Sequence, residues 1–125
     1  MAEILPPLWL TRDAADCIAA QARRAALEML SAALPAWSAA RRDALLRACQ
    51  EAWGVSAITA AGLIAGNASA IAAAYSLRGN IAGVLLMASV DGPLVVVGMV
   101  SRILGKRMNC RDCYWIDFSP LEAAE

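Results

Sequence analysis

Apolar and polar positions in the N-terminal half of the chain recur with a helical period. Between residues 13 and 34, apolar side chains return at spacings of three and four, which predicts an amphipathic helix that ends before Pro35. The predicted apolar stripe consists of Ile18, Ala22, Ala25, Met29 and Ala33. Residues 38–53 predict a second helix, with Ser38 as its N-cap and Gly54 at its end. Because the link between them is short, we expect the two helices to pack as an antiparallel hairpin.

Charged side chains are almost absent from the central part of the chain, between Gly54 and Gly105. The three that remain are Arg78, Asp91 and Arg102. Residues 56–76 open this stretch and predict one buried helix, with Ser56 as its N-cap. A row of small residues, which would let another backbone approach closely, consists of Gly62, Gly66, Ser69 and Ala73.

The apolar run over residues 81–104 is rich in β-branched side chains and is interrupted by Asp91-Gly92-Pro93, which predicts a β-hairpin. Neither strand of the hairpin alternates between apolar and polar side chains. We therefore expect both faces of the hairpin to be buried against other parts of the protein. Residues 113–118 predict a third strand, which ends before Pro120.

Together these elements predict an α+β fold, in which a helical hairpin and a buried third helix pack on a small antiparallel sheet. A length of 125 residues suits one domain. We expect this domain to span residues 1–125. Its predicted segments are an extended stretch at 1–12, a helical part at 13–76, a β part at 81–118 and a tail at 119–125.

The central stretch also allows a membrane-spanning alternative. Residues 56–77 and 81–103 are each long enough to cross a bilayer core of about 30 Å, and basic residues precede the first segment and follow the second. Such a two-span hairpin resembles small phage holins and would lie in the inner membrane. Asp91 argues against it, because aspartate in the middle of a span costs about 2.5–3.5 kcal/mol. We therefore expect a soluble, cytoplasmic protein.

Composition narrows the function classes. Hydrophobic residues make up 60% of the chain, but alanine is common, so hydropathy overstates the apolar area available for burial. Eleven basic and eleven acidic residues give a net charge of zero, which removes the electrostatic case for a nucleic-acid partner. The chain has no histidine, which excludes Ser-His-Asp and Cys-His catalysis and histidine-ligated zinc. We expect a protein without enzymatic activity.

Cys110 and Cys113 form the one motif-like cluster, a Cys-x-x-Cys pair. Such a pair exchanges with disulfides or supplies half of a zinc site. Cys17 and Cys49 stand at apolar positions of separate predicted helices, where small buried side chains are expected. The pair at 110 and 113 is therefore structural, a reactive dithiol, or a ligand pair for zinc shared across a dimer.

Candidate interface residues lie on the predicted strands. Trp115 alternates with Tyr114 and Ile116, so it faces outward if those residues face the core, and an outward tryptophan is a typical interface anchor. The other candidates are Val95, Val97 and Met99 of the hairpin. We expect a small accessory, inhibitor or immunity-type factor that binds a protein partner and associates with itself as a homodimer. The alternatives are the membrane hairpin and a thiol or zinc protein.

Overall fold

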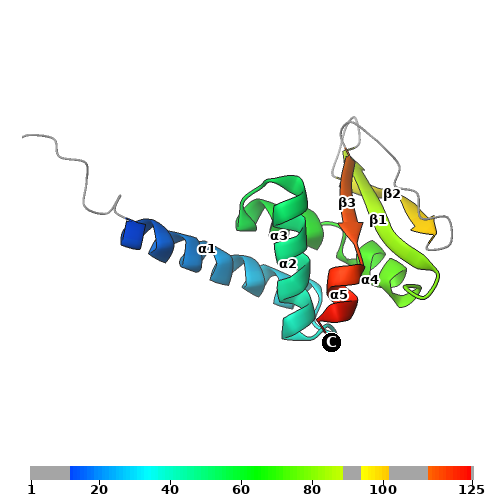
Figure 1. The fold of residues 1–125 in the computed structure, drawn as a ribbon, viewed down its shortest axis with the longest axis horizontal. Coiled ribbons are helices and arrows are strands. Elements are labelled where there is room, and N and C mark those ends of the chain that lie inside the picture. The colour runs from blue at the N-terminus through cyan, green and yellow to red at the C-terminus, as the bar shows by residue number, and fades with distance from the viewer. Residues whose placement is uncertain (1–11, 89–93, 102–112, 125) are drawn as a thin grey trace, which may run out of the picture.

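The described residues of the protein, 12–88, 94–101 and 113–124, form five helices and three strands (Figure 1). The structure is a computed structural model, and the side chains at 87, 88 and 94–101 are outside its described part. The elements are α1 (Arg12–Ala33), α2 (Ala39–Trp53), α3 (Ala57–Ala65), α4 (Ala68–Ser76), β1 (Ile81–Ala88), β2 (Leu94–Ser101), β3 (Cys113–Asp117) and α5 (Ser119–Ala123). This is the α+β fold that the sequence predicts. Of the predicted extended segment at 1–12, only Arg12 is described, and it begins α1.

α1 has nearly the predicted extent but buries a different face. Ala26 and Leu30 are fully buried, whereas Ile18 and Met29 of the predicted stripe are 57% and 37% exposed. The predicted stripe was wrong because alanines occur on every side of this helix, and the large Leu30 side chain decides which side enters the core. Most of residues 12–21 are exposed, and this part of α1 projects beyond the other elements (Figure 1).

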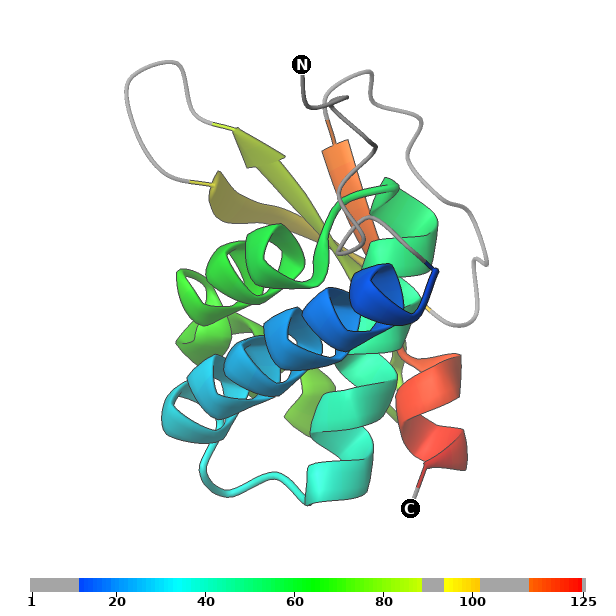
Figure 2. The same ribbon diagram turned by 90° about the vertical axis from the view of Figure 1, so that its left-hand side faces the viewer.

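α2 begins and ends at the residues that the sequence marks as its caps. Ser38 Oγ accepts a hydrogen bond of 3.1 Å from the backbone N–H of Arg41. Gly54 has a φ of 65°, a left-handed conformation that glycine adopts without strain, and its N–H donates to Gln50 O at 2.8 Å. The link from α1 to α2 is short, as expected. α1 lies across α2 and packs more extensively along α3 (Figure 2).

The predicted single helix at 56–76 is two helices, α3 and α4, with a bend of 74° between them. The break lies at Asn67, whose Nδ2 donates to Leu63 O at 2.9 Å. The side-chain amide therefore donates to the carbonyl oxygen that would accept a hydrogen bond from the backbone N–H of Asn67 in a continuous helix. That N–H donates to Ile64 O instead, at 3.0 Å. The prediction was wrong because one side-chain hydrogen bond replaces a helical backbone bond.

The predicted hairpin is formed by β1 and β2, and the predicted third strand, β3, pairs with the other edge of β1. The sheet is antiparallel, and the order of the described strands is β2-β1-β3. The β1–β2 register shifts between Ile81 and Gly83 and again between Leu85 and Leu86. Such bulges bend a strand and interrupt the strict alternation of its side chains.

The helices and the sheet share one hydrophobic core. Val84 of β1 and Ile116 of β3 lie in it together with buried side chains of α1, α2, α3 and α4. Trp37, Tyr75 and Phe118 form a chain of ring contacts through this core, with centroid distances of 5.1 and 5.2 Å. The shared core agrees with the expected single small domain.

The predicted tail at 119–125 contains a short helix, α5, over Ser119–Ala123. Asp117 Oδ1 accepts a hydrogen bond of 2.9 Å from the backbone N–H of Ser119, and Pro120 lies in the first turn. Both features favour the start of a helix. Leu121 is fully buried in the core, so hydrophobic burial holds α5 against the domain.

Within the described residues, no single helix has the length and apolar composition needed to cross a membrane, and α3 and α4 meet that requirement only as a bent pair. Residues 81–88 and 94–101, which the membrane alternative takes as part of a second span, are strands. The cytoplasmic localisation stays a prediction.

Candidate functional site

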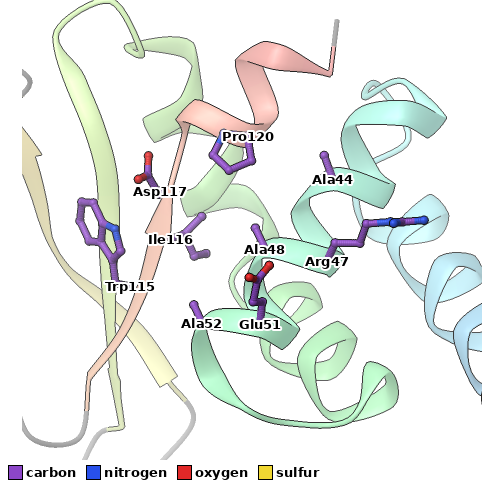
Figure 3. Close-up of a pocket in the computed structure, with 9 residues that line it drawn as sticks. All are labelled: Ala44, Arg47, Ala48, Glu51, Ala52, Trp115, Ile116, Asp117 and Pro120. Atoms are coloured by element: carbon purple, nitrogen blue, oxygen red, sulfur yellow. The ribbon is translucent and has the colours of Figure 1, made fainter.

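An open cleft with a volume of about 470 Å³ lies between α2, β3 and α5 (Figure 3). We call it the α2–β3 cleft. Its lining residues are Ala44, Arg47, Ala48, Glu51 and Ala52 of α2, Trp115, Ile116 and Asp117 of β3, and Pro120 of α5. Its surface is mostly apolar, and its charged groups lie on α2 and at the end of β3.

Alanines form the helix wall of the cleft. Ala44, Ala48 and Ala52 follow one another at four-residue spacings and therefore lie along one side of α2. Their methyl groups leave space that longer side chains would fill. Trp53, the next residue, bridges the two walls, because its Nε1 donates to Trp115 O at 3.1 Å. This bond holds α2 at a fixed separation from β3.

β3 contributes its outer edge to the cleft, the edge that does not pair with β1. The backbone N–H of Phe118 donates to Ala82 O of β1 at 3.0 Å. Because peptide groups alternate in direction along a strand, those of Trp115 and Asp117 point to the opposite edge. The bond that Trp115 O accepts from α2 agrees with this direction. The cleft therefore combines an apolar wall with the backbone of a strand edge.

The charged side chains at the cleft differ in whether they form an ion pair with another described residue. Arg47 Nε donates to Asp43 Oδ2 at 2.9 Å, and Asp43 also forms an ion pair with Arg23 of α1. Partial burial raises the pKa of the Asp43 carboxyl, but hydrogen bonds and charges of Arg23 and Arg47 outweigh it and hold that pKa below its ordinary value. Among the described residues, Glu51 and Asp117 make no ion pair. Among the described residues that line the cleft, the excess charge is negative.

Trp115 is half-buried, and its ring points away from α2 while Ile116 points toward it (Figure 3). The ring covers Gly83 of β1, where a Cβ atom would come within 2.6 Å of Trp115 Cη2. Glycine therefore makes room for the tryptophan on the neighbouring strand. Leu85, the register partner of Trp115, is 2% exposed.

The other predicted interface residues belong to β2, which β1 separates from β3 and Trp115. Val95 is the register partner of Met87, and Met99 is the register partner of Val84. Val97 falls between paired positions, at the register shift opposite Leu85 and Leu86. The structure does not bring these valines and Met99 beside Trp115, and their side chains lie outside the described part. Their assignment to an interface stays a prediction.

The cysteines occupy different environments. Cys113 begins β3 and is disulfide-bonded, and Cys110 lies outside the described residues. Cys17 is exposed on α1, contrary to the expectation of burial, because the N-terminal part of α1 projects from the fold. Cys49 is buried as expected, and this burial raises the pKa of its thiol far above the ordinary value. Within the described residues no group of three or more His, Cys, Asp or Glu side chains could hold a metal ion. Zinc binds cysteine as a thiolate, so a zinc role for Cys110 and Cys113, which stays a prediction, requires the reduced form of Cys113.

The cleft itself has no signature in the sequence. Alanines at 44, 48 and 52 predict a helix face that packs closely, and nothing in their spacing indicates that β3 stays at a distance. That separation depends on Trp53, which is 62 positions away from its acceptor Trp115.

Comparison with known proteins identifies no relative of the chain. No protein-family model, curated protein or solved structure matches the chain. The function must therefore be argued from the geometry of the α2–β3 cleft.

Proposed function

We propose that the protein acts without catalysis, by binding a segment of a protein partner in the α2–β3 cleft. The observation that carries this proposal is one open, mostly apolar cleft whose walls are the alanines of α2 and the strand β3. A volume of about 470 Å³ falls in the range of roughly 300–1,000 Å³ that ligand sites occupy.

The chemistry of the lining favours binding over catalysis. In the described part of the cleft, the charged side chains are Arg47, Glu51 and Asp117, and the rest of the lining is apolar side chain and backbone. Arg47 is engaged by Asp43, and Asp117 accepts from the first N–H of α5. A catalytic site needs a nucleophile or acid–base group beside a partner that tunes it, and these three side chains supply no such pair.

A peptide-display selection tests the proposal. Octapeptides from a random library are selected on the immobilised full chain, and their affinities are then measured for Ala48→Trp, which fills the cleft. The matched control is Ala73→Trp, an exposed alanine of α4 outside the cleft. We expect selected peptides to bind the wild type and Ala73→Trp equally and to lose at least about tenfold in affinity for Ala48→Trp. A selection without peptides, or peptides that ignore the Ala48 change, contradicts the proposal.

A second candidate function, self-association, is favoured by β2. Among the described strands β2 is at an edge of the sheet, and its sequence from Leu94 to Ser101 has no charged residue. Edge strands without charge or proline are suited to pairing with another chain. We infer that two copies associate through β2, and the oligomeric state of the purified protein tests this idea.

A further inference from the structure

Cys113, the first residue of β3, is the one described cysteine that takes part in a disulfide. The chain has four cysteines, and of these Cys17 and Cys49 are free thiols. Within the chain, the partner of Cys113 can therefore only be Cys110, which lies outside the described residues. The bond thus closes the Cys-x-x-Cys motif itself.

β3 is held in the fold by contacts that do not involve the Cys113 side chain. Its backbone pairs with β1, Ile116 is 1% exposed in the shared core, and Trp53 Nε1 donates to Trp115 O at 3.1 Å. A disulfide stabilises a fold mainly by restricting the unfolded chain, and this effect grows with the length of the closed loop. A bridge across two intervening residues closes a very short loop, so the stability that it adds is small.

The cysteines differ in their access to a reaction partner. Cys113 is half-buried, so a small molecule can reach its side chain. Cys49 is 1% exposed, and burial raises the pKa of its thiol far above the ordinary value. Because the thiolate is the form that exchanges with disulfides, Cys49 is inert at neutral pH. Reactivity toward small thiols and disulfides is therefore expected at Cys113 and not at Cys49.

The sequence around the motif is basic. Lys106, Arg107 and Arg111 stand within seven positions of Cys113, and Asp112 is the one acidic residue among them. Cations stabilise a nearby thiolate and so make it a better leaving group when a disulfide is opened. This composition favours a bridge that opens and closes over a permanent one.

We propose that Cys110 and Cys113 are a reversible redox pair, which exchanges with small thiols and disulfides of the glutathione type. The proposal goes beyond peptide binding in the α2–β3 cleft and does not depend on it. In a reducing compartment, disulfides are usually transient and serve catalysis or redox sensing. The cytoplasmic localisation predicted from the sequence thus agrees with a sensing pair.

The exchange reaction consumes two molecules of reduced glutathione. The first glutathione thiolate attacks one sulfur of the bridge, which forms a mixed disulfide and releases the other cysteine as a thiolate. The second attacks the glutathione sulfur of the mixed disulfide, so that oxidised glutathione leaves and the second cysteine is released. The protein gains two electrons and two protons in total, and oxidised glutathione reverses both steps.

Thiol counting in glutathione buffers tests the proposal on the full chain. Cys17 is exposed and would itself react with glutathione, so the measurement uses Cys17→Ser. The protein is equilibrated at a series of ratios of reduced to oxidised glutathione, quenched with acid, unfolded and labelled with N-ethylmaleimide. Mass spectrometry should show one label, on Cys49, at the oxidising end and three labels at the reducing end. Both states should be populated within the range that glutathione poises.

Two results of this titration overturn the proposal. One label at every ratio means a structural disulfide that resists the glutathione pool, and three labels at every ratio mean that no stable bridge forms. Peptide mapping of the oxidised form should place the bridge between Cys110 and Cys113, and a bridge between any other pair also overturns the proposal. Peptide binding in the cleft is measured separately, so either proposal can fail without the other.

A matched variant and the fold of the reduced protein complete the test. In Cys17→Ser/Cys110→Ser, Cys113 has lost its partner and should carry one glutathione at the oxidising end. If no adduct forms, Cys113 does not exchange and the proposal is wrong. The far-UV circular dichroism spectrum should be the same in the oxidised and reduced protein, because other contacts hold β3. Loss of the spectrum on reduction would mean that the bridge is structural.

Discussion

Gly83 lies where the main chain of β3 and an aromatic ring leave no room for a side chain. A Cβ atom at this position would be 2.1 Å from Ile116 O and 2.6 Å from the ring of Trp115. Real Cβ atoms do not approach a backbone oxygen so closely, so an alanine would force β1 and β3 apart. The position therefore couples strand pairing to the placement of Trp115 beside the cleft.

We predict that Gly83→Ala lowers the free energy of unfolding by about 1–3 kcal/mol, as overpacked core substitutions do. Urea denaturation followed by circular dichroism measures the change. Gly62→Ala is the control, because no atom lies within 4 Å of a Cβ at that exposed helix position. It should stabilise the protein by roughly 0.5–1 kcal/mol through helix propensity. Equal effects of both substitutions would mean that β1 and β3 do not approach as described.

At the scale of elements, the break between α3 and α4 depends on Asn67. Asn67 is 8% exposed and its side chain donates to Leu63 O, so removing the amide leaves a carbonyl at the bend without this donor. We predict that Asn67→Ala lowers the free energy of unfolding by about 1 kcal/mol. The control is Ser69→Ala, an exposed position in the first turn of α4. An Asn67→Ala protein as stable as the control would show that the bend does not depend on the amide.

The contact between α1 and α2 should depend on pH through Asp43. Because the pKa of Asp43 is lowered in the folded protein, its ion pairs stabilise the fold above the unfolded pKa of about 3.9 and are lost as the pH falls through the folded value. We predict that Asp43→Asn costs about 0.5–1 kcal/mol at pH 7, since the pair is partly exposed. This difference should shrink below about pH 4. Asp16→Asn, an exposed α1 position, serves as control, and a pH-independent cost at Asp43 would contradict the ion-pair account.

The secondary structure could be predicted from the sequence where single residues, such as a cap or a turn residue, determine where an element begins or ends. Ser38 and Gly54 mark the two ends of α2, and the apolar runs on either side of residues 91–93 form the paired strands β1 and β2. The buried face of α1 and the bend at Asn67 were not predicted, because an alanine-rich helix offers several equivalent faces and a buried asparagine satisfies a backbone carbonyl only in a particular tertiary setting. The cleft was missed for a similar reason, since Trp53 and Trp115 meet only in the folded chain.

At the scale of the whole molecule, the two strands of the hairpin, β1 and β2, differ in their neighbours. The core-facing residues of β1 are buried against the helices, and β2 is left at an edge of the described sheet with an uncharged sequence. Pairing of β2 with the same strand of a second copy would continue the sheet across a two-fold axis, the arrangement that symmetric dimers use. Such a dimer would leave the α2–β3 cleft, at the opposite edge of the sheet, free in both copies.

We predict that size-exclusion chromatography with light scattering gives twice the chain mass of 13.1 kDa for the wild type. Val97→Lys should give a monomer, because lysine on an edge strand opposes pairing with another chain and residue 97 falls between paired positions of the β1–β2 register. Ala73→Lys adds the same charge on the exposed side of α4 and should stay dimeric. Since both variants are first checked by circular dichroism, a folded wild-type protein that elutes as a monomer at every concentration would exclude association through β2, while leaving peptide binding at the cleft intact.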